Sequence, residues 1–147
     1  MKLDRIYDTA MYSLLVEHRK YFGKDEAYDE VLDRLKFLRQ NMARASSRGE
    51  KSQKILVSVD YVYDVGEFQG WECALSGYPL AFTRGGTMFG GKWCNPKSCT
   101  IDRIDSTKGY VEGNIQLICW DVNFLKRDLP ESDFIQLVTD IAMHCNQ

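Results

Sequence analysis

The 147-residue chain lacks several features that would point directly to a common functional class. No apolar run is long enough to span a bilayer, and residues 1–6 lack the uninterrupted apolar core of a signal peptide. We therefore expect a cytoplasmic protein with no membrane partner. Neither a G-x-x-x-x-G-K-[ST] nor a G-x-G-x-x-G arrangement occurs, and no nucleophile elbow is present, so the usual nucleotide-binding loops and serine hydrolases are not indicated.

Histidine is scarce, and the cysteines do not form a recognisable framework. The five cysteines are an odd number, which together with the missing export signal argues against disulfides. A four-sulfur zinc site from Cys73, Cys94, Cys99 and Cys119 has the right number of thiols. However, neither Cys73 nor Cys119 is followed by a second cysteine at the spacing of a zinc knuckle. We therefore expect buried free thiols and no structural zinc.

Two segments near the N-terminus place apolar residues at helical spacing, over residues 3–22 and 25–45. The break between them, at Gly23 and Lys24, predicts an antiparallel helical hairpin, and Asp25 is the expected N-cap of its second helix. Such a hairpin is typical of a packing or dimerisation element that carries no chemistry.

A polar and locally basic stretch follows at residues 45–54. It is either a solvated connector or an arm that contacts phosphates. The interpretation divides the chain into a helical hairpin with a basic linker, residues 1–55, and a second unit, residues 56–147. The central part of that unit, residues 71–127, carries seven basic and five acidic side chains, which permits a nucleic-acid partner without requiring one.

The second unit mixes helical and extended patterns, so the predicted class is α+β. Residues 57–69 fit a strand by composition and a helix by spacing, and residues 70–99, rich in Gly, Pro and aromatics, suggest loops with short strands. Residues 100–126 read as strand, loop, strand and helix. Residues 131–145 form a final amphipathic helix that Pro130 introduces.

The segment 100–126 also contains the candidate chemistry. Asp102 stands at the end of the first predicted strand and Asn123 stands on the predicted helix. Both offer hard oxygen donors, which suit Mg²⁺ or Mn²⁺. Arg103 provides a guanidinium next to Asp102, a group suited to binding phosphate. A divalent cation beside a phosphate-binding arginine is an arrangement that cleaves phosphodiesters.

This segment resembles the HNH, or ββα-metal, nuclease family. The matching residues are Asp102-Arg103, Gly109-Tyr110, Gly113-Asn114, and Asn123 with Lys126. Upstream, residues 69–80 are similar to the Gln-Gly-x-Cys-x-x-(Cys or Ser/Thr)-Gly entry of the family. The resemblance covers roughly residues 57–145, and it favours a helix over 57–69. It implies an N-terminal helical hairpin, then a ββα-metal core, then a C-terminal helix.

The resemblance implies a metal-dependent DNA endonuclease that acts on double-stranded DNA by nicking or by double-strand cleavage, with a homodimer as one option. If a phage encodes the chain, it would act in the host cytoplasm. The implied catalytic residues are Asp102, Arg103, Asn114 and Asn123, of which Asp102 and Asn123 hold the metal and Asn114 braces the loop. The implied nucleic-acid contacts come from Arg103, Lys108, Lys126 and Arg127. Asp105 and Tyr110 are candidate supporting residues.

The chain departs from the family at Arg103, where most members carry a histidine that acts as general base. Arginine stays protonated at neutral pH and cannot accept a proton from water. Neither His18 nor His144 falls in the motif. Two rival hypotheses follow. One is a non-catalytic DNA-binding or regulatory protein built on a decayed nuclease site, and the other is an interaction module whose helical hairpin binds a partner protein.

Overall fold

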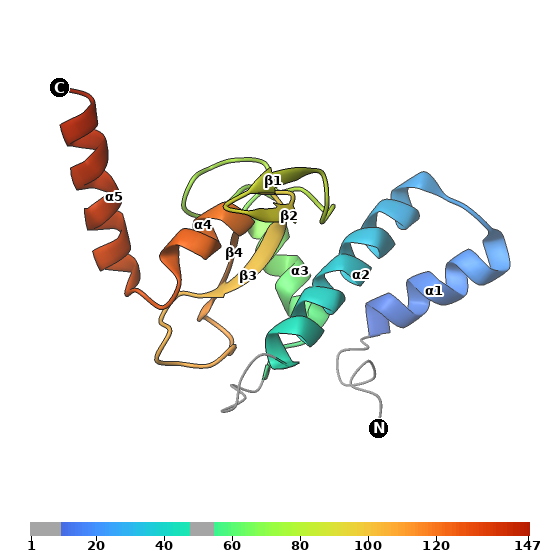
Figure 1. The fold of residues 1–147 in the computed structure, drawn as a ribbon. Coiled ribbons are helices and arrows are strands. Elements are labelled where there is room, and N and C mark those ends of the chain that lie inside the picture. Colours follow the sequence, from blue (N-terminus) through green and yellow to red (C-terminus); the bar gives the residue numbers. More distant parts are fainter. Residues whose placement is uncertain (1–9, 48–54) are drawn as a thin grey trace.

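The computed structural model describes residues 10–47 and 55–147, and these residues combine helices with two small antiparallel sheets (Figure 1). The predicted α+β class is therefore confirmed. The helices are α1 (Ala10–Phe22), α2 (Glu26–Ser47), α3 (Val59–Phe68), α4 (Trp120–Lys126) and α5 (Glu131–Cys145). The strands are β1 (Thr87–Phe89), β2 (Lys92–Cys94), β3 (Cys99–Arg103) and β4 (Ile115–Cys119).

Helices α1 and α2 form the hairpin that the apolar spacing predicts. Asp25 stands directly before α2 and caps it, as predicted: its Oδ1 accepts a hydrogen bond from the amide of Ala27 at 3.1 Å. Residues 3–9 of the first predicted helix and 48–54 of the predicted linker lie outside the described residues. The ambiguous stretch 57–69 is helical, as α3, with Ser58 as its N-cap.

One hydrophobic core joins α2 to the sheet that carries the candidate chemistry. It contains Leu35, Leu38 and Met42 from α2 on one side, and Val62 from α3 and Leu117 from β4 on the other. This core spans the predicted boundary at residue 55. A hydrogen bond of 2.8 Å from the side chain of Asn41 to the carbonyl of Cys99 also fixes α2 against the start of β3.

Strands β3 and β4 pair antiparallel, and α4 begins directly after β4, so the predicted order of strand, loop, strand and helix is confirmed. The register places Asp102 opposite Gln116. The separate hairpin β1–β2 lies over α4, where the ring of Phe89 meets the ring of Trp120 edge to face at 5.8 Å.

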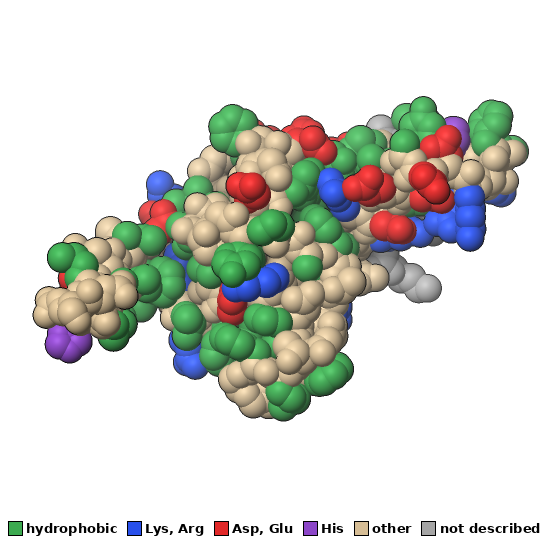
Figure 2. Space-filling model, turned by 90° about the horizontal axis from the view of Figure 1, so that it is seen from above, with side chains coloured by type: hydrophobic (Ala, Val, Ile, Leu, Met, Phe, Trp, Pro, Cys, Tyr) green, Lys and Arg blue, Asp and Glu red, His purple; other side chains and the backbone are tan. Residues whose placement is uncertain are grey.

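Helix α5 has the bounds that the sequence predicts and projects away from the rest of the molecule (Figure 1). Phe134 is its one buried residue, and hydrophobic side chains are exposed along the helix, at the left of Figure 2. Across the described residues, no helix combines the length and the apolar character needed to cross a membrane.

The packing of α3 gives a first testable expectation, at Gly66. A Cβ added there would overlap the ring of Trp71, which itself packs edge to face on Tyr63. We expect Gly66→Ala to destabilise the protein by about 1–3 kcal/mol, because overpacking outweighs the better helix propensity of alanine. Urea unfolding measures this effect. The exposed Asp64→Ala on the same helix is the control, and a stabilised Gly66→Ala variant would contradict the packing.

Candidate functional site

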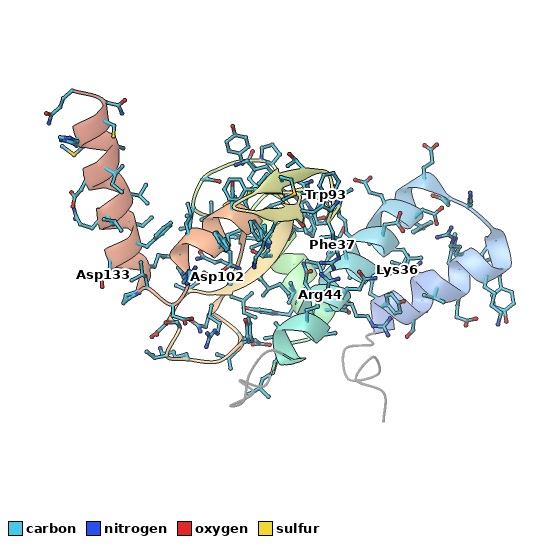
Figure 3. All side chains as sticks on the ribbon, viewed as in Figure 1. Lys36, Phe37, Arg44, Trp93, Asp102 and Asp133 are labelled. Carbon is cyan, nitrogen blue, oxygen red and sulfur yellow. The ribbon has the colours of Figure 1, made fainter. Side chains whose placement is uncertain are left out.

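A groove of about 720 Å³ lies beside β3 and α4 and collects most of the candidate residues. Asp102, Arg103, Tyr110, Asn123 and Arg127 all line it, although they come from strand, loop and helix. Residues of α2 and Lys92 of β2 complete its walls. Figure 3 shows Asp102 beside α4. Four other candidates, Asp105, Lys108, Asn114 and Lys126, do not line the groove.

Asp102 is nearly buried, with 7% of its surface exposed, and its two carboxylate oxygens have different surroundings. Oδ2 accepts hydrogen bonds from Nζ of Lys126 at 2.9 Å and from Nε2 of Gln116 at 3.0 Å. Oδ1 accepts no hydrogen bond from a described residue and is not sealed from solvent. The carboxylate is thus held by one oxygen, and the other remains available to a ligand in the groove.

Lys126 lies in the interior, and the expectation that it contacts DNA from the surface of the helix is corrected. Its side chain is 1% exposed, and Nζ donates to Asp102 and, at 3.3 Å, to the carbonyl oxygen of Arg103. The physical reason is the burial of Asp102, because a carboxylate removed from water needs a partner charge. Lys126 therefore supports the site from within.

Asn123 reaches the groove from α4 with its amide held in one orientation. Its Nδ2 donates to Oγ1 of Thr100 at 3.0 Å, and that hydroxyl donates to the carbonyl oxygen of Ile118 at 2.8 Å. The amide oxygen Oδ1 accepts no hydrogen bond from a described residue. Asn123 can therefore offer an oxygen ligand in the same groove as Asp102.

Arg103 is held in place by the loop that follows β3. Its Nη1 donates to the carbonyl oxygens of Ser106 at 2.9 Å and Lys108 at 3.3 Å, and its guanidinium lies 5.4 Å from the centre of the Tyr110 ring. Its Nη2 also lies 4.0 Å from Oδ1 of the exposed Asp128. The guanidinium is thus pre-oriented, on a side chain that is 19% exposed and lines the groove.

The carboxylate of Asp105, a candidate supporting residue, pairs with Thr107. Its Oδ1 accepts hydrogen bonds from the hydroxyl of Thr107 at 2.6 Å and from the amide of Thr107 at 2.9 Å, and these bonds lower the pKa of Asp105. The carboxylate is engaged within its own turn, where it shapes the loop between β3 and β4.

Asn114 braces that loop with three hydrogen bonds to the backbone. Its Oδ1 accepts from the amide of Asp105 at 2.9 Å, and its Nδ2 donates to the carbonyl oxygens of Asp105 at 3.1 Å and Gly109 at 2.9 Å. The residue is 6% exposed and stands outside the groove. Asn114 therefore acts on the geometry of the loop that carries Arg103 and Tyr110.

A cationic and aromatic rim borders the groove on the side of α4. The rings of Trp120 and Phe124 stack at 5.0 Å, and both Nζ of Lys92 and the guanidinium of Arg127 lie 5.6 Å from the centre of the Phe124 ring. Sequence reasoning missed Lys92, because only the docking of the β1–β2 hairpin brings it here. Lys92, Arg103 and Arg127 give the groove three cationic side chains.

The upstream motif packs on the other edge of the β3–β4 sheet. Nε2 of Gln69 donates a hydrogen bond to the backbone carbonyl oxygen of Leu117, and Oε1 of Gln69 accepts one from the backbone amide of Leu117, both at 2.9 Å. Sγ of Cys73 accepts from the amides of Cys119 at 3.3 Å and Ser76 at 3.4 Å. This segment therefore supports β4, and it supplies no side chain to the groove.

The available ligands suit a hydrated cation. Among the residues that the structure describes, no group of three or more His, Cys, Asp or Glu side chains is placed to hold a metal ion. Asp102 and Asn123 can supply two oxygen ligands, and Mg²⁺ commonly keeps several waters beside one or two protein ligands. All five cysteines are free thiols, and four of them are buried.

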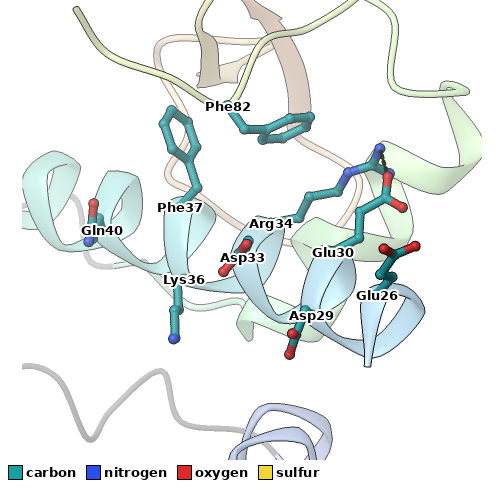
Figure 4. Close-up of a pocket in the computed structure, with 9 residues that line it drawn as sticks. All are labelled: Glu26, Asp29, Glu30, Asp33, Arg34, Lys36, Phe37, Gln40 and Phe82. Atoms are coloured by element: carbon teal, nitrogen blue, oxygen red, sulfur yellow. Dashed lines mark hydrogen bonds and ion pairs between the residues drawn. The ribbon is translucent and has the colours of Figure 1, made fainter. Parts of the chain in front are cut away.

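A second groove, of about 650 Å³, lies on α2 away from the candidate residues (Figure 4). It is lined by four carboxylates, Glu26, Asp29, Glu30 and Asp33, and by only two cationic side chains. Acidic side chains also gather over the α1–α2 arm in Figure 2. This negative surface would repel a phosphate backbone, so we place no nucleic-acid contact there.

The chain matches no protein-family model, no curated protein and no solved structure. The HNH assignment therefore stays a resemblance carried by the motif residues.

Proposed function

We propose that the chain is a divalent-cation-dependent endonuclease with an HNH-like ββα-metal core that hydrolyses DNA phosphodiesters. The observation that carries the proposal is the shared groove, where Asp102, Asn123 and Arg103 meet although they are up to 21 positions apart in the chain. A phosphate in this groove would meet a pre-oriented guanidinium and two oxygen ligands for a cation.

Each residue has a separate role in the proposal. Asp102 and Asn123 hold Mg²⁺ or Mn²⁺, which when bound supplies positive charge to the phosphate oxygens as negative charge develops there. Arg103 binds the scissile phosphate, and Tyr110 supports its guanidinium. Lys92 and Arg127 bind flanking phosphates of a duplex. Neither His18 nor His144 lines the groove, so the proposal assigns no histidine as general base.

Incubation of the purified protein with supercoiled plasmid tests the proposal. We expect conversion to nicked or linear DNA with Mg²⁺ or Mn²⁺, and none when EDTA is present. Linear product formed in one binding event would favour a homodimer with two grooves, whereas nicked product alone would favour a monomer. Plasmid that stays supercoiled with Mg²⁺, Mn²⁺, Ni²⁺ and Co²⁺ would overturn the proposed activity.

One observation favours the rival function, a DNA-binding protein with a decayed site. Nζ of Lys126 lies 2.9 Å from Oδ2 of Asp102, so a protein cation already balances the charge that a metal would otherwise balance. In that case duplex DNA would bind to the rim without being cut. Band-shift titrations run beside the plasmid assay separate the two functions, because only the rival predicts binding without nicking in every metal.

The cationic rim predicts a specific change in salt dependence for Arg127→Ala. Each phosphate contact contributes about 0.9 to the slope of log affinity against log salt concentration for duplex DNA. We expect Arg127→Ala to reduce that slope by about 1 and to weaken binding similarly for all sequences. Fluorescence anisotropy at several salt concentrations measures the slope. Lys24→Ala, exposed between α1 and α2, is the control, and equal slopes in all three proteins would remove Arg127 from the interface.

A further inference from the structure

The carboxylate of Asp102 is linked to the first residue of α5 through one side chain. Nε2 of Gln116 donates to Oδ2 of Asp102 at 3.0 Å and to Oε1 of Glu131 at 2.6 Å. Gln116 is 8% exposed, and Glu131 opens helix α5. A single amide group therefore uses both of its N–H bonds to join two carboxylates from different elements.

This link stands behind Asp102 with respect to the groove. Neither Gln116 nor Glu131 lines the groove, whereas Asp102 does. Gln116 and Lys126 both donate their hydrogen bonds to Oδ2 of Asp102. Oδ1 accepts no hydrogen bond from a described residue. The hydrogen bonds thus fix the rotation of the carboxylate and leave Oδ1 without a donor among the described residues, so that it can bind a ligand.

We infer that Gln116 and Glu131 are positioning residues for the cation site, and that the first turn of α5 is therefore part of its support. The inference rests on the proposed function, since it concerns the cation that Asp102 would hold. It adds two residues that are not among the matches to the HNH motif. It also gives α5, which otherwise projects from the molecule, a defined connection to the site.

Glutamine suits position 116 for a chemical reason. Its amide is neutral and donates two hydrogen bonds, so it can separate two carboxylates without adding a charge. A glutamate there would bring a third negative charge between Asp102 and Glu131. A methionine would keep the approximate length and volume but would donate to neither oxygen. Asp102 would then be held by Lys126 alone among its described hydrogen-bond donors.

Glu131 acts on Asp102 by fixing the amide of Gln116. Replacement by glutamine keeps an acceptor oxygen at position 131, whereas replacement by alanine removes it. The inference therefore predicts different outcomes for two substitutions that both remove the same negative charge. If Glu131 acted on the cation only through its negative charge, both variants would change cation binding by the same amount.

Binding of Mn²⁺, measured by isothermal titration calorimetry on the full chain without DNA, tests the inference. We expect Gln116→Met and Glu131→Ala to weaken Mn²⁺ binding about tenfold, the lower end of the loss seen when partners of metal ligands are removed. Glu131→Gln should bind within about twofold of the unsubstituted protein. Asp133→Ala is the matched control, because Asp133 lies in the same first turn of α5 and is exposed (Figure 3).

The outcomes separate this inference from the function on which it rests. If Mn²⁺ binds, and Asp102→Asn abolishes binding, but both Gln116→Met and Glu131→Ala bind normally, the positioning role is overturned while the cation site stands. If the unsubstituted protein binds no Mn²⁺, both the cation site and the positioning role are overturned. Circular dichroism confirms that each variant is folded, and the half-exposed Glu131 provides the test if Gln116→Met does not fold.

Discussion

Asp102→Asn is expected to reduce Mg²⁺-dependent cleavage of plasmid DNA by about a thousandfold, which corresponds to about 4 kcal/mol of lost transition-state stabilisation. The substitution removes the negative charge that attracts a cation to the groove. It keeps the shape of the side chain and an oxygen that can accept from Lys126 and Gln116. A loss of activity in Asp102→Asn therefore tests the role of the carboxylate charge more directly than a loss of activity in Asp102→Ala.

Alanine is the weaker choice at this position because of the ion pair. Asp102→Ala would leave Lys126, 1% exposed, without its carboxylate partner, and breaking a buried pair in this way typically costs about 3–5 kcal/mol. Inactivity would then be confounded with unfolding. Asp102→Asn also leaves the ammonium without a carboxylate, but its amide oxygen still accepts a hydrogen bond from Lys126. Single-turnover cleavage by Asp102→Asn is therefore compared with that of the exposed control Glu112→Gln, after circular dichroism has shown that both variants are folded. Cleavage by Asp102→Asn at the rate of the control would rule out Asp102 as a cation ligand.

Much of the architecture could be predicted because it depends on local patterns. The spacing of apolar residues located α1, α2 and α5, and the pattern of residues 100–126 located β3, β4 and α4. Once the order of strand, loop, strand and helix is known, α4 packs back on the sheet that precedes it. The presence of Asp102 and Asn123 in one groove follows from that geometry.

The partners of these residues could not be predicted in the same way. Lys92 reaches the groove because the β1–β2 hairpin docks on α4, and Glu131 reaches Gln116 because of the path of the chain between α4 and α5. Neither depends on local spacing. The sequence placed Lys126 in the motif with Asn123, but the direction of its ammonium depends on the burial of Asp102. Gln116 had a usable signal, since the antiparallel register pairs it with Asp102.

The second large effect is expected for stability, from Lys126→Met. Methionine fills a similar volume, so the substitution mainly removes the ammonium that pairs with Asp102 at 2.9 Å. Asp102 is 7% exposed, and among the described residues its carboxylate would keep only the hydrogen bond from Gln116. We expect the free energy of unfolding to fall by about 3–5 kcal/mol, because an uncompensated charge is left in the interior. Urea unfolding at neutral pH, followed by circular dichroism, measures this change.

The double variant Asp102→Asn/Lys126→Met identifies the cause. If the loss in Lys126→Met comes from the unpaired carboxylate, removing that charge should restore at least about 2 kcal/mol, so that the double variant is more stable than the single one. Additive losses would instead show that Lys126 stabilises the protein through the packing of its side chain. Recovery in the double variant would also explain why a lysine stands inside a site proposed for a metal, since its ammonium compensates the charge of a buried carboxylate that lines the groove.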